Sequence, residues 1–339
     1  MKKITGFCQK VITTLFVTSF LAGANLHADW TTFSLPPLSQ SFGSYWMGHM
    51  ADGRLVYGSS NAIARESVFG SGALVPYSNA GSWDPSSVSL LSDNLGVVGQ
   101  GTFGPSSLYL FNPSNLATGF TAITGVSIQN YNVVFRDSTS LYVDGLNGSG
   151  TNAFSLPKNA LSYVKTDGSV NKVIIDNISD FSGSFAVDLQ GNLYISNNDT
   201  GGLYKFTLAQ LNGAIAGSPL GIGDGQFLTT LPHDSSIVID ALGRIISAGP
   251  GANGIDIYNP ADNSHTTVVP GLVNSNYVVS TFSDGVDNYI AYIDASGSST
   301  GASLTYGYDK VANVVPEPGS ALLLGLGCGA LVIRRHRRA

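Results

Sequence analysis

Short apolar segments alternate with aspartate-containing turns along most of the chain. In each copy, one apolar segment leads into a turn and a second apolar segment follows it, as in residues 48–57, 185–195 and 237–246. The aspartates that mark these turns are Asp52, Asp93, Asp137, Asp188, Asp240 and Asp284, at spacings of 41 to 52 residues. An apolar–turn–apolar unit of this kind predicts a β-hairpin, so the pattern indicates six related hairpins.

Two further apolar segments follow most of these hairpins. Residues 108–113 (LYLFNP) and 255–260 (IDIYNP) are alike, and both place their Asn 19 residues after the marker aspartate. Residues 203–206 fall in almost the same phase. A fourth segment closes several units, at residues 120–123, 172–175, 227–231 and 266–269. The repeating unit therefore predicts four strands.

Four strands per unit, repeated six times at this period, are typical of a β-propeller. Each small sheet buries its faces by stacking on its neighbours until the ring closes. We predict an all-β protein whose residues 29–312 form a propeller of six four-stranded blades. A different number of blades, a β-sandwich and a β-solenoid are the alternatives. The sixth unit has no clear fourth strand; residues 30–35 are predicted to supply it, with residues 310–315 as the competing segment.

Composition supports an all-β fold with many tight turns. The chain has 41 Gly, and its acidic residues are 20 Asp and only two Glu. Asp favours turns, whereas Glu favours helices.

The charge of the chain depends on its ends. Between residues 29 and 318, nine Lys and Arg face 22 Asp and Glu, a formal net charge of −13. An acidic, sparsely charged domain is a poor partner for nucleic acid or for anionic membrane surfaces. Both cysteines, Cys8 and Cys328, lie in the ends, so the central domain cannot contain a disulfide.

Residues 1–28 have the layout of a secretory signal peptide. Lys2, Lys3 and Lys10 precede the apolar stretch 11–21, and Ala22-Gly23-Ala24 fits an A-x-A cleavage site. Cleavage after Ala28 and an uncleaved N-terminal anchor are the alternatives. The pattern predicts a signal helix and export across the inner membrane, with the Sec machinery as a partner.

The other end predicts a membrane segment. An apolar run, 320–333, is followed directly by Arg334, Arg335, Arg337 and Arg338. Arginines after an apolar run hold that end in the cytoplasm, and their long stems can extend a short span. A buried C-terminal helix of a soluble domain is the alternative.

Residues 313–339 resemble the PEP-CTERM sorting signal of Gram-negative bacteria. The match consists of Pro316-Glu317-Pro318, the glycine-rich apolar stretch and the basic end. The resemblance implies that an exosortase recognises Pro316, Glu317 and Pro318 and cleaves nearby. It also implies a transiently anchored protein that ends at the cell surface or in an exopolysaccharide or biofilm matrix. Cys328 is read as a membrane residue, with lipidation as the alternative.

Residues 187–195 resemble the strand–turn–strand of NHL-type and lactonase-like propellers. The likeness covers one blade well and the others loosely. It bears on the fold more than on an activity, because propellers host many unrelated functions.

Candidate chemistry in the central domain is sparse. No H-E-x-x-H motif is present in the sequence, and His49, His233 and His265 are interpreted as loop or capping residues. Residues 197–202 and 221–225 are oxygen-rich and could hold Ca²⁺, but ordinary hairpin turns explain them better. We predict no catalytic residues and no resident cofactor.

The favoured hypothesis is a surface-targeted propeller that binds matrix polysaccharide or another matrix protein. The alternative is a secreted, metal-dependent hydrolase or lactonase-like enzyme, which requires Asp, Asn and His side chains clustered in the central channel. A channel lined by apolar and hydroxyl groups favours the binding protein. A purely structural spacer would have no concentrated polar site.

Overall fold

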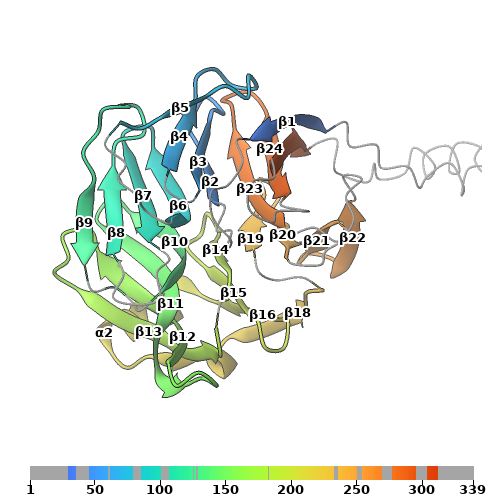
Figure 1. Ribbon diagram of the computed structural model, residues 1–339. Coiled ribbons are helices and arrows are strands. Elements are labelled where there is room, and N and C mark those ends of the chain that lie inside the picture. Colours follow the sequence, from blue (N-terminus) through green and yellow to red (C-terminus); the bar gives the residue numbers. More distant parts are fainter. Residues whose placement is uncertain are drawn as a thin grey trace, which may run out of the picture. The chain divides into compact units, whose positions relative to one another are not determined.

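Six mainly antiparallel sheets make up the computed structural model, as Figure 1 shows. The structure describes residues 30–35, 46–59, 62–78, 85–100, 107–124, 126, 129–181, 183–232, 236–249, 254–268, 277–294 and 304–311. The predicted signal peptide, the Pro316-Glu317-Pro318 element, the apolar run 320–333 and the arginines after it lie outside these residues. None of the helices within the described ranges is long and apolar enough to cross a membrane.

The first three blades follow one another along the chain, and each pairs its strands in sequence order. Blade 1 comprises β2 (Trp46–His49), β3 (Leu55–Ser59), β4 (Ala62–Glu66) and β5 (Leu74–Pro76). Blade 2 comprises β6 (Pro85–Ser92), β7 (Leu95–Gln100), β8 (Ser107–Phe111) and β9 (Thr121–Thr124). Blade 3 comprises β10 (Asn130–Asp137), β11 (Ser140–Thr151), β12 (Pro157–Lys165) and β13 (Asn171–Ser179), with the short β17 (Leu220–Gly221) added parallel to β13.

The last three blades repeat the arrangement with two variations. Blade 4 comprises β14 (Phe185–Val187), β15 (Leu193–Asn197), β16 (Gly202–Phe206) and β18 (Gln226–Thr230). Blade 5 comprises β19 (Ser236–Ile239), β20 (Ile245–Ala248), β21 (Ile255–Asn259) and β22 (Ser264–Val268). Blade 6 takes β23 (Tyr277–Ser283), β24 (Asn288–Asp294) and β25 (Leu304–Lys310) from the end of the chain and β1 (Thr31–Leu35) from its beginning.

Strand β1 closes the ring, which confirms the predicted role of residues 30–35. It pairs antiparallel with β25, from Thr31 opposite Tyr308 to Leu35 opposite Leu304. The first strands of successive blades also contact one another in a full circle, including β23 with β2. The predicted six-bladed propeller is therefore confirmed, and the competing segment after Lys310 is not the closing strand.

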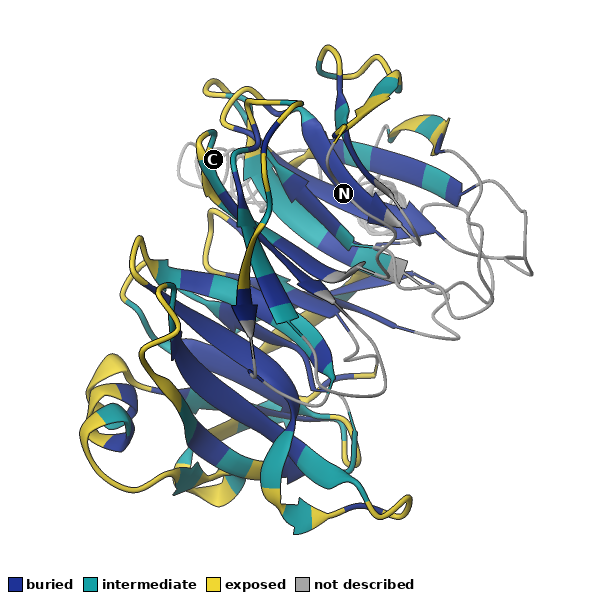
Figure 2. Ribbon diagram, turned by 60° about the vertical axis from the view of Figure 1, so that its left-hand side comes forward, coloured by how far each residue is buried: buried dark blue, intermediate teal, exposed yellow. Residues whose placement is uncertain are grey.

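The core consists of apolar layers between neighbouring blades, as Figure 2 shows by the buried colour along the strands. One layer joins blades 3 and 4, where Tyr142 and Leu161 pack with Phe185 and Phe206. Another joins blades 6 and 1, where Leu35 and Tyr306 pack with Met47 and Tyr57. Because each blade shares its faces with both neighbours, opening the ring at any point would expose apolar surface.

The strand directions give the propeller two distinct faces. The turns between the first and second strands of the blades all lie on one face, together with the connections between third and fourth strands. We call this the Asp-turn face, because the six marker aspartates lie in its inner turns. The opposite face carries the turns between second and third strands and the connections between blades.

Most marker aspartates accept hydrogen bonds from the backbone of their own turns, whereas Asp93 accepts from the Ala51 N–H of blade 1. Asp188 accepts hydrogen bonds from the N–H groups of Gln190 and Asn192, and Asp240 does so from Leu242 and Arg244. Such Asx-type bonds are the physical reason for the repeating aspartate. At Asp284, hydrogen bonds from the Asp287 and Val286 N–H groups and from the Tyr289 hydroxyl hold the carboxyl pKa below its ordinary value.

Helix α2 (Leu208–Ala216) and the 3₁₀ turn η1 (Ile222–Asp224) are inserted between β16 and β18. The helix starts with a capping box, in which Thr207 accepts from the Gln210 N–H and the Gln210 side chain accepts from the Thr207 N–H. Leu211 and Ala214 bury one side of the helix against the layer between blades 3 and 4. This helix does not change the all-β class.

Candidate functional site

The central channel is lined by the first strand of every blade. It holds a cavity of about 270 Å³. Its described lining residues are mostly apolar, with hydroxyl, Asn132 and His49 side chains among them, and no Asp or Glu belongs to the described lining.

Most polar side chains of the channel wall bond to a neighbouring blade. The Asn132 amide donates to the Phe185 carbonyl, which ties blade 3 to blade 4. Ser184 Oγ accepts from the Ile237 N–H at 2.9 Å, and Ser236 Oγ accepts from the Val279 N–H at 3.1 Å. These groups are occupied in holding successive blades in register, because a buried N–H without a partner is costly.

His49 lies in the channel wall where blade 1 meets blade 6. Its ring stacks on Phe282 with centroids 4.0 Å apart. One ring nitrogen is hydrogen-bonded to the Tyr306 hydroxyl at 2.9 Å and the other to Ser280 Oγ at 3.3 Å. Burial lowers the pKa of His49 to about 3, so the imidazole is neutral at physiological pH. The neutral ring, with both nitrogens engaged, joins the closing blades, and His49 lies within β2 rather than in the predicted loop or cap.

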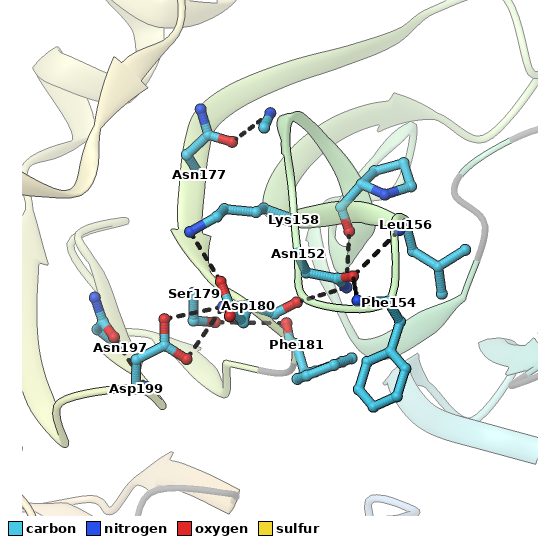
Figure 3. Close-up of polar contacts among 12 residues, drawn as sticks. Asn152, Phe154, Leu156, Lys158, Asn177, Ser179, Asp180, Phe181, Asn197 and Asp199 are labelled. Atoms are coloured by element: carbon cyan, nitrogen blue, oxygen red, sulfur yellow. Dashed lines mark hydrogen bonds and ion pairs between the residues drawn. The ribbon is translucent and has the colours of Figure 1, made fainter.

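A second polar cluster lies on the face opposite the Asp-turn face, at the long hairpin between β11 and β12 (Figure 3). Asn152 organises the hairpin tip, since its side-chain oxygen accepts from the N–H groups of Phe154 and Leu156. Its amide nitrogen donates to the Asp180 carbonyl in the connection to blade 4. The hairpin tip is therefore fixed to the body of the protein rather than held by strand pairing alone.

Carboxylates extend this cluster to blade 4. Lys158 forms an ion pair with Asp180 at 2.8 Å, and the Asp180 N–H donates to both carboxylate oxygens of Asp199 (Figure 3). Asp199 belongs to the turn between β15 and β16, so the network spans two blades. It contains one cation and two carboxylates, all at least partly accessible to solvent.

The hairpin displays an aromatic ring on this polar base. Phe154 is 72 % exposed, although it is a large apolar side chain. The edge of its ring meets Phe181, with centroids 5.4 Å apart (Figure 3). We call Phe154, Phe181, Asn152, Lys158, Asp180 and Asp199 the hairpin platform. An exposed ring held rigidly beside hydrogen-bonding groups is an arrangement suited to ligand contact.

The structure brings only part of the predicted chemistry together. Of the two oxygen-rich loops, 197–202 supplies Asp199 to the hairpin platform, and in 221–225 Asp224 accepts from the Gly221 N–H. His265 is hydrogen-bonded to Thr229 Oγ1 at 3.1 Å on the rim of blade 5. Within the described ranges no three His, Cys, Asp or Glu side chains group in a way that could hold a metal ion. His233 and the sorting-signal residues lie outside those ranges.

A buried carboxyl went unnoticed in the sequence. Asp144 lies on β11 at the boundary with blade 4, and its side chain is fully buried. Burial raises the pKa of Asp144 well above its ordinary value, and the nearby Asn159 side chain and Gly183 N–H act in the opposite direction. No motif marks this aspartate among the many aspartates in turns. Its position within a strand, between apolar residues, was the available signal.

Comparison with known proteins supports the fold and goes no further. No family model matches the sequence, and no curated protein matches it. Among solved structures, regucalcin from Agrobacterium tumefaciens, a calcium-binding protein, has a TM-score of 0.57 at 15 % identity over 81 % of this chain and 91 % of its own. A gluconolactonase from Xanthomonas campestris has a TM-score of 0.55 at 11 % identity over 82 % and 89 % of the chains.

A luciferin-regenerating enzyme has a TM-score of 0.58 at 13 % identity, over 82 % of this chain and 93 % of its own. These proteins are lactonase-like six-bladed propellers, so the likeness noted in residues 187–195 holds for the fold. At such low identity the similarity does not extend to their ligands or reactions.

Proposed function

We propose that this chain is an exported cell-surface protein that binds neutral polysaccharide of the extracellular matrix through the hairpin platform. The observation that carries the proposal is Phe154, a 72 % exposed aromatic ring held by a hydrogen-bonded hairpin. Aromatic side chains offer a large, rigid contact surface at low entropic cost, and the apolar face of a sugar ring can pack on one. Lys158, Asp180 and Asp199 provide donors and acceptors for sugar hydroxyls beside it.

Charge restricts the kind of polysaccharide. The domain between residues 29 and 318 carries nine basic and 22 acidic side chains. Such a field repels polyanions at long range, so an acidic glycan is a poor partner and a neutral one is favoured.

The ends of the chain support the location. The signal-peptide pattern of residues 1–28 and the PEP-CTERM pattern of 313–339 are the basis for proposing Sec export, transient anchoring by the apolar run and processing by an exosortase. The processed protein would remain at the cell surface or in the matrix.

The alternative, a metal-dependent lactonase-like enzyme, remains a proposal based on the shared fold alone. In the described part of the channel, Asn132, Ser184 and Ser236 are engaged by neighbouring blades. We therefore favour the surface of the hairpin over the channel as the binding site.

The hairpin platform is tested by replacing Phe154 with alanine. We expect the dissociation constant for fluorescently labelled neutral polysaccharide from the host matrix to rise about tenfold, because a contact worth about 1.4 kcal/mol is lost. Microscale thermophoresis would measure this. Phe227→Ala is the matched control, since Phe227 is also an exposed phenylalanine but lies on blade 4 at β18. Equal affinities of wild type and Phe154→Ala would reject the platform.

The sorting signal is tested by replacing Pro316, Glu317 and Pro318 with alanine. We expect the wild-type protein from the host surface to have lost residues beyond this element, and the variant to keep them, because the exosortase reads these residues. Intact-mass spectrometry of surface and medium fractions measures the difference. A wild-type mass that still includes the segment 321–339 would show that the tail is a plain anchor.

A further inference from the structure

Both ends of the propeller lie on the Asp-turn face. Strand β1 begins at Thr31 opposite Tyr308, near the end of β25. Strand β25 ends at Lys310, whose ammonium group forms an ion pair at 2.6 Å with Asp287 in the inner turn of blade 6. The chain therefore enters and leaves the propeller side by side, next to that turn.

The same face carries most of the exposed apolar side chains. Leu189, Leu242 and Val286 are 99 %, 60 % and 87 % exposed, and they lie in the inner turns of blades 4, 5 and 6. Four more lie at the turns and strand ends of this face: Val68, Leu91, Val170 and Leu208. Of the ten large apolar side chains that are exposed in the described residues, seven thus belong to this face.

Leu189, Leu242 and Val286 lie at the tips of three neighbouring turns, so these exposed side chains are grouped rather than scattered over the surface. They are held out rigidly, since Asp188, Asp240 and Asp284 each fix the turn that carries one of them. Exposed apolar groups gathered on one face of a protein indicate a contact surface. Tips that protrude from separate turns suit a deformable partner better than a shaped one, and a hollow lined by Leu189, Asp137 and Arg136 lies beside the first of them.

We propose that the Asp-turn face rests against a zwitterionic lipid surface, with the side chains of Leu189, Leu242 and Val286 at the level of the lipid headgroups. This inference rests on the proposed anchoring by the apolar run. Nine residues separate Val311 from Ala321, so the ten steps between the two Cα atoms span at most about 35 Å when fully extended. A chain anchored through this run keeps the Asp-turn face of blade 6 within that distance of the bilayer, so its apolar tips can enter the interface.

The charge of the face selects the lipid. In the inner turns of blades 4 to 6, Arg244 and Lys310 are paired with Asp240 and Asp287, and Asp188 and Asp284 are two further carboxylates. Anionic headgroups would be repelled, whereas zwitterionic ones would not. In this orientation the hairpin platform on the opposite face points away from the membrane, toward the matrix.

The test places an environment-sensitive NBD dye on single cysteines of the full chain, with Cys8 and Cys328 replaced by serine. The labelled positions are Val286→Cys, Leu242→Cys and Leu189→Cys, and Phe154→Cys is the matched control on the opposite face. The proteins are incorporated into phosphatidylcholine vesicles with and without headgroup-region doxyl lipid. We expect blue-shifted emission and at least twofold doxyl quenching at the three turn positions, and neither at position 154.

Two results would overturn the inference in different ways. If the protein floats with the vesicles but the turn labels keep aqueous emission, the anchoring holds and the lipid-facing surface is wrong. If the protein does not float, both the anchoring and the orientation fail. Blue-shifted turn labels without vesicles would show that another copy of the chain covers the face, which also excludes the lipid contact.

Discussion

Replacing Leu35 by alanine should lower the free energy of unfolding of the whole propeller by about 3 kcal/mol. Leu35 is the last residue of β1 and is 1 % exposed. It packs in the layer between blades 6 and 1, with Met47, Tyr57 and Tyr306. The truncation removes apolar contacts and leaves a cavity where the first segment of the described chain meets the last, so it weakens ring closure directly.

Equilibrium urea unfolding, followed by tryptophan fluorescence and far-UV circular dichroism, measures this effect. Thr32→Ala is the control on the same strand, because Thr32 is exposed and makes no contact with that layer. We expect the control to remain within about 0.5 kcal/mol of wild type. If the two variants were equally stable, β1 would not be the strand that holds the ring closed.

The blades could be predicted because the causes of their hairpins are local. A carboxylate that accepts hydrogen bonds from its own turn, as Asp188 and Asp240 do, is favoured at inner turns of the same geometry, although Asp93 bonds instead to the Ala51 N–H of blade 1. The alternating apolar residues on either side then fix the strands. Helix α2 interrupts this repeat, and its capping box, Thr207 to Gln210, was the sequence signal that a search for strands passed over.

The candidate site depends on residues that meet only when the blades assemble. Asp180 and Asp199 are separated by blade 4 strands in the sequence, yet a backbone N–H of one bonds to the carboxylate of the other. Phe154 reads as one more core phenylalanine until the length of the β11–β12 hairpin is known. The bonds from Ser184 and Ser236 to the next blade are equally invisible to local patterns, since they join residues about one repeat apart.

Lowering the pH from 7.5 to 5 should destabilise the propeller by between about 1 and 2 kcal/mol through His49 alone. The folded-state pKa of His49 is about 3, because burial disfavours the charged ring, whereas the ordinary value is 6.5. Between these values the unfolded chain binds a proton that the folded protein does not. The stability that His49 contributes is therefore full above pH 6.5 and is lost as the pH falls toward 3. At pH 5 the loss of stability depends mainly on the pKa of the histidine in the unfolded chain. Partial access of water to the channel makes this loss smaller.

Comparing wild type with His49→Gln isolates this contribution, because glutamine stays neutral throughout. Other groups contribute equally to both proteins. The pKa values of Asp137 and Asp284 are lowered in the folded protein, so these groups reduce its stability only below about pH 4. The pKa of Asp144 is raised, so this group instead favours folding at acidic pH. Urea unfolding at half-unit pH steps should give a shallower decline of stability for His49→Gln below pH 6.5. Parallel curves for the two proteins would mean that the imidazole titrates freely in the folded channel, and that burial where blades 1 and 6 meet does not keep it neutral.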